Sequence, residues 1–180
     1  MAYGAIEVAE WILWLAAQNG VRLTPMQLQK LLYYAQGYSL GMGGEKLFRE
    51  SIFAWEHGPV VKEVFHNYKR FVANKIMPPQ SVNIPDDAFG VIEAVVSRKS
   101  NLSASELRKA THEETPYSET AYNDEISTEK IKDYFVDHFW VSDEEDEYEP
   151  SFDGEKEERE FFHESLPEWK KQAIADAISQ

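Results

Sequence analysis

Histidine is the residue type in this chain best suited to acid–base or metal chemistry. No histidine belongs to a His-Glu-x-x-His zinc helix, because His112-Glu113 and His163-Glu164 both lack the second histidine. The chain has no glycine-rich phosphate loop, no Gly-x-Ser-x-Gly elbow and no cysteine. We therefore expect neither a catalytic site nor a bound metal or cofactor.

Glu56 and His57 together have the composition of an acid–base pair. Sequence neighbours on a turn often point apart, and no nucleophile lies nearby, so a structural role for His57 is the favoured interpretation. A deep pocket that holds Glu56, His57 and His112 together would instead indicate an enzyme.

The helix expected from Thr24 onward has a complete set of start signals. Thr24 suits the N-cap, Pro25 the first helical position and Gln27 the capping box, while Leu23 and Leu28 form a hydrophobic staple. An apolar stripe follows at helical spacing, made of Leu28, Leu31, Leu32, Ala35 and Tyr38. The polar side is then Gln27, Gln29, Lys30, Tyr33 and Gln36. This side is either a solvated helix face or, through Gln29, Lys30 and Tyr33, a contact surface.

A second segment, residues 54–61, reads Ala-Trp-Glu-His-Gly-Pro-Val-Val. Gly58 allows positive φ, and Pro59 suits the first turn of a helix with Val64, Phe65 and Tyr68 on one side. The preceding apolar stretch, residues 47–55, favours a small β-hairpin.

Punctuation along the rest of the chain predicts further helices. The first is expected over residues 5–18, stopped by Asn19-Gly20. After a proline-rich loop at residues 77–85, Asp86 is expected to cap another, and Ser103 with Glu106 forms a second capping box. A last helix is expected from Ser127.

These segments resemble the Panacea family, an antitoxin domain also described as phage-associated. The resemblance rests on the leucine-rich helix after Thr24, on residues 54–61, and on a block from Leu102 through Thr111-His112-Glu113 to Pro116-Tyr117, where the family usually has tryptophan instead of Tyr117. It covers about residues 5–136. It implies a mostly helical domain that neutralises a cognate protein toxin by direct binding, without identifying that toxin.

The charge of the chain is strongly asymmetric. Residues 1–110 have a net charge of +2 and residues 111–180 one of −16. A near-neutral body with an acidic extension indicates a cationic partner, solubilisation or mimicry of a nucleic-acid surface. No basic recognition helix is evident, so nucleic acid is not the expected partner. The apolar run at Val8 to Ala17 is too short to span a bilayer and lacks a basic flank, and we therefore expect a cytoplasmic protein.

We thus expect a mainly α-helical fold: a compact multi-helix Panacea-like domain over residues 1–136 with a small β-hairpin, followed by an acidic linker and an amphipathic C-terminal helix over residues 137–180. The linker's carboxylates would steer a basic toxin and the apolar anchors would hold it. Alternatively, the terminal helix packs on its own domain. The expected partner-binding residues are Gln29, Lys30, Tyr33, Trp55, His57, Pro59, Asp143, Glu144, Glu145, Asp146, Glu147, Phe161, Phe162, Trp169 and Ile174.

Two other functions remain open on sequence grounds. The chain could be an adaptor that delivers a bound protein to a protease, or a phage or mobile-element transcriptional regulator. The adaptor needs a second docking surface, and the regulator needs a basic recognition helix. The sequence does not define the oligomeric state.

Overall fold

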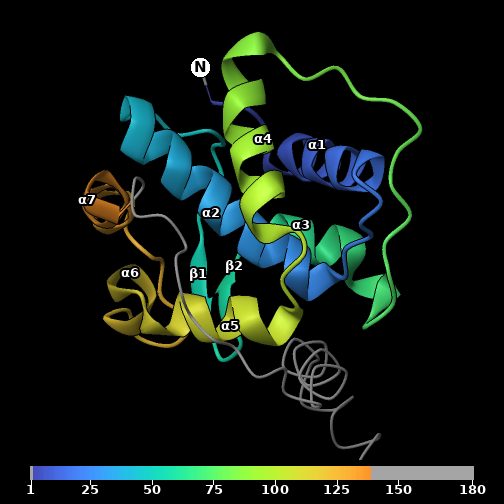
Figure 1. Cartoon of the computed structure of the whole chain (residues 1–180). Coiled ribbons are helices and arrows are strands. Elements are labelled where there is room, and N and C mark those ends of the chain that lie inside the picture. Colours follow the sequence, from blue (N-terminus) through green and yellow to red (C-terminus); the bar gives the residue numbers. More distant parts are fainter. Residues whose placement is uncertain (1, 139–180) are drawn as a thin grey trace, which may run out of the picture.

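A computed structural model describes residues 2–138, which are mainly α-helical with one two-stranded antiparallel sheet (Figure 1). This confirms the expected fold class. The elements in chain order are α1 (Ala5–Gln18), α2 (Pro25–Gly43), β1 (Phe53–Trp55), β2 (Gly58–Val60), α3 (Lys62–Tyr68), the 3-10 helix η1 (Lys69–Phe71), α4 (Asp86–Lys99), α5 (Ala104–Glu113), α6 (Thr115–Ser118) and α7 (Thr128–His138).

Helix α2 runs through the middle of the domain (Figure 1). It contacts α1, α3, α4, α5, α7 and β2. The expected capping box is present: the Thr24 hydroxyl accepts from the amide of Gln27, and the Gln27 side chain accepts from the amide of Thr24. Every residue of α2 from Pro25 to Tyr38 is buried. Helix α2 is therefore a central helix, with neighbours on its polar and apolar sides alike.

The hairpin pairs Phe53 with Val60, Ala54 with Pro59 and Trp55 with Gly58. The expected hairpin is confirmed, although its second strand lies beyond the apolar stretch that suggested it. The expectation that Pro59 opens a helix is wrong, because Pro59 lies in β2 and α3 begins at Lys62. Proline is tolerated in such an edge strand because it lacks only a donor that the partner does not need.

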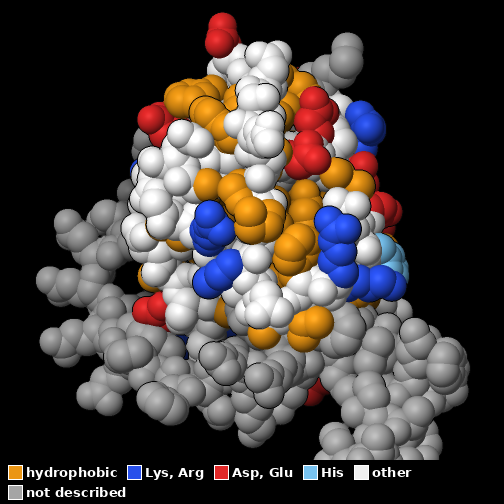
Figure 2. Space-filling model, turned by 90° about the vertical axis from the view of Figure 1, so that its right-hand side faces the viewer, with side chains coloured by type: hydrophobic (Ala, Val, Ile, Leu, Met, Phe, Trp, Pro, Cys, Tyr) orange, Lys and Arg blue, Asp and Glu red, His pale blue; other side chains and the backbone are white. Residues whose placement is uncertain are grey.

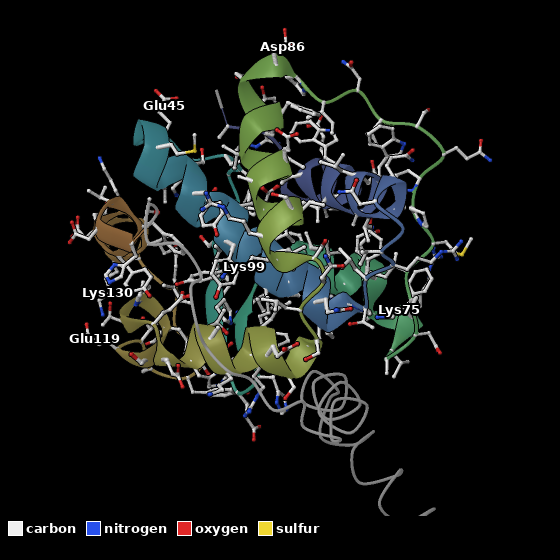
Figure 3. The ribbon with its side chains drawn as sticks, viewed as in Figure 1. Glu45, Lys75, Asp86, Lys99, Glu119 and Lys130 are labelled. Carbon is white, nitrogen blue, oxygen red and sulfur yellow. The ribbon has the colours of Figure 1, made fainter. Side chains whose placement is uncertain are left out.

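Helix α4 stands at the end of a long connection. Residues 72–85 run from η1 up to α4 along the right-hand side of Figure 1, the side that Figure 2 turns toward the viewer. Figure 3 labels Asp86 and Lys99, which are the two ends of α4. The expected cap by Asp86 is wrong: Pro85 is the N-cap residue, and Asp86 is the first residue of the helix.

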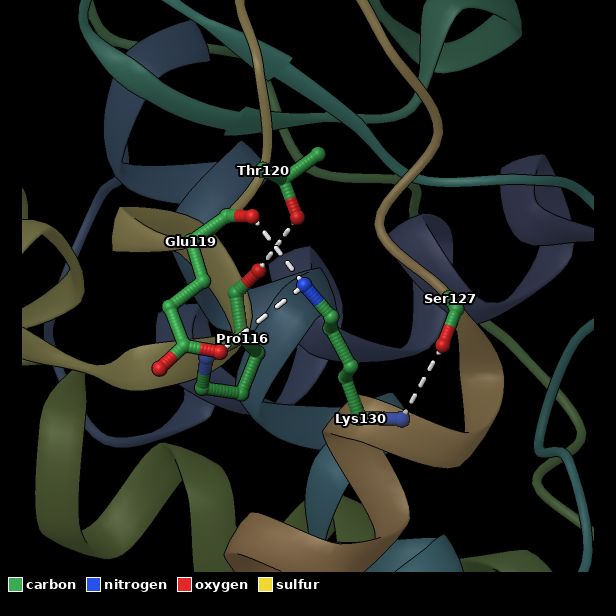
Figure 4. A network of polar contacts seen from close by, with 5 residues as sticks. All are labelled: Pro116, Glu119, Thr120, Ser127 and Lys130. Carbon is green, nitrogen blue, oxygen red and sulfur yellow. Dashed lines mark hydrogen bonds and ion pairs between the residues drawn. The ribbon is translucent and has the colours of Figure 1, made fainter.

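Both α5 and α7 begin as the sequence indicates. Ser103 forms a capping box with Glu106, and the Ser127 hydroxyl accepts from the amide of Lys130. The Lys130 ammonium also donates to the carbonyl of Glu119 at 3.0 Å and lies 3.9 Å from its carboxylate (Figure 4). The start of α7 is thereby tied to the end of α6, although this exposed ion pair is worth at most about 1 kcal/mol.

Two glycines bring α7 close to α2. A Cβ added at Gly37 would lie 2.3 Å from the ring of Phe135, and one added at Gly41 would lie 2.7 Å from the Phe135 carbonyl oxygen. The Phe135 ring packs edge-on against Tyr33, Tyr34 and Tyr38. The absence of side chains at Gly37 and Gly41 therefore sets how deeply α7 can pack.

Candidate functional site

Helix α2, the hairpin and helix α5 are far apart in the sequence and meet around Gly58. The Lys30 side chain is fully buried, and its Nζ donates to the carbonyl of Pro59 at 3.2 Å. Gly58 has φ of +105°, and a Cβ there would lie 2.8 Å from Nζ and Cε of Lys30 and 3.1 Å from Oγ1 of Thr111. The hairpin, α2 and α5 can therefore come together only if residue 58 has no side chain.

Glutamines of α2 hold neighbouring backbone segments. Gln29 accepts from the amide of Val61 at 2.8 Å and donates to the Val61 carbonyl at 3.3 Å. Gln36 accepts from the amides of Leu47 and Phe48 and donates to the Phe48 carbonyl. Each amide side chain satisfies backbone groups that would be costly to bury without a partner. Glutamines Gln29 and Gln36 thus connect α2 to the extended segments beside it.

These contacts correct the expected polar face of α2. Gln29, Lys30 and Tyr33 are 2%, 0% and 0% exposed, so they form neither a solvated face nor an accessible contact surface in this conformation. Helical spacing identifies the sides of a helix, and it does not reveal that both sides have neighbours. His57 and Pro59 are buried as well, whereas Trp55 is half-buried and reaches the surface.

A recess of about 610 Å³ lies where the hairpin turn meets α5 and α6. We call it the hairpin pocket. Its lining combines aromatic rings, hydroxyl groups and one charge of each sign. The lining residues are Ala54, Trp55, Glu56, Arg108, His112, Tyr117, Ser118, Thr120 and Tyr122. Glu56 and His112 therefore line one pocket, and His57 is not among the residues that line it.

His112 fastens the hairpin turn to α5. Its Nδ1 lies 2.7 Å from the Arg108 carbonyl oxygen, and its Nε2 lies 2.9 Å from the Glu56 carbonyl oxygen. Burial lowers the pKa of His112 from its usual 6.5, and the two carbonyl contacts oppose that shift. A neutral imidazole has one N–H, so His112 can donate to only one of these carbonyl groups, while the Tyr117 hydroxyl lies 3.0 Å from Nε2, within reach of its lone pair. Because partners within the protein surround both ring nitrogens, this geometry suits a positioning role better than proton transfer to a ligand.

Tyr117 completes the junction. Its hydroxyl lies 2.7 Å from the carbonyl oxygen of Trp55 and 3.0 Å from Nε2 of His112, and its ring packs 4.4 Å from the imidazole. The residue at which the sequence departs from the usual tryptophan therefore binds the hairpin backbone through its hydroxyl group. Residues 54–61 and the Thr-His-Glu block are brought into direct contact, which sequence spacing alone does not show.

A buried carboxyl group, Glu114, was not singled out by the sequence. The Tyr34 hydroxyl donates to its Oε1 at 2.8 Å, and the Tyr33 hydroxyl faces the same carboxyl. Burial raises the pKa of Glu114 to about 7, against the opposing effects of the two tyrosines, Lys99 and His138. The two adjacent tyrosines of α2 were a usable signal, because buried hydroxyl groups require polar partners.

Part of the expected partner-binding surface lies outside the described residues. This part consists of the acidic run from Asp143 to Glu147 and the anchors Phe161, Phe162, Trp169 and Ile174. Within residues 2–138, no cluster of three or more histidine, aspartate or glutamate side chains is arranged to hold a metal ion. Over the same range, no helix has the length and apolar character needed to span a membrane.

Comparison with known protein families gives a match that covers the centre of the chain. A family model described as "Antitoxin SocA-like, Panacea domain" matches residues 28–118, about half of the 180 residues. The matched range includes most of α2, the whole hairpin, and α5 and α6. No curated protein and no solved structure matches the chain.

Proposed function

The chain belongs to the Antitoxin SocA-like, Panacea domain family, and on that premise we propose that it neutralises a cognate protein toxin by binding it directly. The family match is the observation that carries this proposal. Binding is favoured over catalysis because both ring nitrogens of the histidine in the hairpin pocket lie within hydrogen-bond distance of groups of the protein itself. The proposal places this binding in the cytoplasm, which a sequence without cysteine permits.

The hairpin pocket is the docking site that the fold favours for a side chain of the toxin. It lies at the junction of the family's sequence blocks, and Trp55, Tyr117 and Tyr122 contribute aromatic surface to it. Tyr122 is 66% exposed. Recesses of this size lined by aromatic rings and a few polar groups are typical places for an apolar anchor of a partner.

The acidic extension supplies a second part of the proposed interaction. Residues 143–147 are five consecutive carboxylates, and aromatic and aliphatic residues follow at positions 161, 162, 169 and 174. Carboxylates accelerate encounter with a basic protein, whereas buried apolar anchors slow its dissociation. We therefore propose that residues 143–147 set the association rate and that the later anchors prolong the complex.

Co-expression with the product of the adjacent reading frame tests the antitoxin proposal. We expect the neighbouring protein alone to arrest growth, and the full chain to restore growth and to co-purify with it. A harmless neighbour that does not co-purify would contradict the proposal and would favour the adaptor or regulator.

The pocket is tested with Tyr122→Ser by measuring the affinity of the purified protein for the toxin identified in that assay. The matched control is Met42→Ser, since Met42 is also an exposed apolar residue, at 52%, and does not line the pocket. We expect Tyr122→Ser to weaken toxin binding about tenfold or more, as loss of an aromatic anchor commonly does, and Met42→Ser to have no effect. Equal binding by the two variants would remove the pocket from the interface while leaving the antitoxin function intact.

A further inference from the structure

A basic face with an apolar centre lies on the side of the domain away from α7. The amide of Ile76 donates to the carbonyl of Leu23, which sets the residues around Lys75 beside the connection between α1 and α2. Arg22 reaches across this junction, with its guanidinium 3.5 Å from the sulfur of Met77. η1 comes just before this segment in the chain and adds Lys69 and Arg70. We define the basic face as Arg22, Lys69, Arg70 and Lys75 with Val21, Phe71 and Met77.

This face combines exposed cationic side chains with apolar groups. All four cationic side chains are exposed, and Met77 is 63% exposed. Figure 2 shows this side of the molecule, with Lys and Arg side chains bracketing hydrophobic ones near its centre and Asp and Glu side chains above them. Burial raises the pKa of Tyr68, the residue before Lys69, and the nearby Glu10 carboxylate adds to this shift. A ligand for the basic face should therefore combine negative charge with apolar groups.

One segment of the chain itself has this composition. Residues 139–180 carry 14 Asp and Glu against 4 Lys and Arg, a net charge of −10, and they include Phe161, Phe162 and Trp169. They follow directly after α7, whose last residue is His138. We propose that this acidic C-terminal segment docks in cis on the basic face.

Chain length and tethering both allow this contact. Residues 139–160 span up to about 70 Å when extended, which exceeds the path of about 60 Å around half of a compact domain whose radius of gyration is about 14 Å. Single exposed ion pairs contribute little, about 0 to 1 kcal/mol each. Tethering nevertheless raises the effective concentration of a segment, into the millimolar range for short linkers, so several weak contacts are sufficient for docking.

With this contact, the basic face and a cationic partner would both bind the acidic segment. A cationic partner must then compete with the basic face for the same carboxylates, so the domain limits binding of weakly basic proteins. This consequence is additional to the proposed antitoxin function, and the docking itself does not depend on that function. It can be measured on the isolated full-length chain.

Paramagnetic broadening provides the test, since a chain without cysteine accepts one unique label. A nitroxide is attached to full-length Ser151→Cys protein, and amide signals are compared with those of the reduced label. We expect signals of Val21, Arg22, Lys69, Arg70 and Lys75 to lose half of their intensity or more at low salt. They should recover at an ionic strength of about 0.5 M, where the Debye length falls to roughly 4 Å.

Charge reversal identifies the contact further. The variant is Arg22→Glu/Lys69→Glu/Arg70→Glu. Lys75 is not substituted, because the Nζ of Lys75 donates to the capping residue Gln27. This variant should lose the broadening. A control with the same change of charge, Lys46→Glu/Lys109→Glu/Lys132→Glu, uses exposed lysines outside the basic face and should retain it.

The outcomes that overturn the proposal are distinct. Broadening centred on another face, or none that salt abolishes, would exclude docking on the basic face. Broadening seen only when a labelled copy is mixed with an isotopically enriched, unlabelled copy would show that a second molecule supplies the segment, and it would overturn docking in cis.

Discussion

Gly58 is the residue on which the junction of hairpin, α2 and α5 depends most directly. Its φ of +105° is unfavourable for residues with a Cβ, and that Cβ would meet Lys30 and Thr111 at about 3 Å. We expect Gly58→Ala to destabilise the fold by about 2 to 4 kcal/mol through backbone strain and overpacking. Urea denaturation measures the change. Gly43→Ala is the control, because nothing lies within 4 Å of a Cβ at the end of α2. Equal stability of the two variants would contradict this account.

Glu114 should make stability depend on pH. Because burial raises the pKa of Glu114 to about 7, the folded carboxyl keeps its proton where the unfolded one, with a pKa near 4.5, has lost it. The folded state then binds more protons, so this group's contribution favours folding below about pH 4.5 and is lost as pH rises through about 7, by up to roughly 3 kcal/mol.

The variant Glu114→Gln isolates that contribution, since its amide oxygen can still accept from Tyr34. We expect the free energy of unfolding of wild type, relative to Glu114→Gln, to fall between pH 5 and pH 8 in urea titrations. Parallel pH profiles for the two proteins would show that the carboxyl does not titrate in this range.

At the scale of the elements, helices α2 and α7 approach each other closely because α2 has glycine at the contact. A Cβ at Gly41 would meet the backbone carbonyl of Phe135 at 2.7 Å, and a helix backbone cannot move aside as a side chain can. We expect Gly41→Ala to cost about 1 to 3 kcal/mol from overpacking, despite the better helix propensity of alanine. In Gly90→Ala, the same substitution on α4 has no neighbour within 4 Å and should stabilise by about 0.5 to 1 kcal/mol. Thermal unfolding of both variants measures these changes in stability. If Gly41→Ala did not destabilise the protein, α7 would be able to move away from α2 freely.

The elements also show what the sequence could predict. Both capping boxes are local, so Thr24 with Gln27 and Ser103 with Glu106 identified helix starts correctly. The environment of α2 is set by segments distant in sequence, and no periodicity in the helix indicates that Gln29 binds the backbone of Val61. The hairpin pocket was hidden for the same reason, because it forms only when residues 54–56 meet α5 and α6. Local signals therefore predicted the elements, while the site required their packing.

In the whole molecule, most of the net negative charge lies after residue 138. Residues 1–138 carry a net charge of −4 and residues 139–180 one of −10, yet the basic face concentrates four cations within the first part. If the acidic segment docks there and also steers a basic toxin, the two proposals make opposite demands on the same carboxylates. Neutralising residues 143–147 should slow toxin association and flatten its salt dependence, since fewer charges act at long range. An unchanged association rate at low salt would exclude steering by this run.

Reversing the charge of the basic face should have the opposite effect on the rate of toxin association. In Arg22→Glu/Lys69→Glu/Arg70→Glu the acidic segment loses its competitor, so toxin association at low salt should accelerate a few-fold. Part of any increase comes simply from added negative charge, and the triple lysine control at positions 46, 109 and 132 measures that part. Stopped-flow association of the full-length proteins with toxin separates the two contributions. An increase in the basic-face variant no larger than in the control would mean that the segment is not held back before the toxin arrives, whereas a larger one would show that the domain and its partner compete for one ligand.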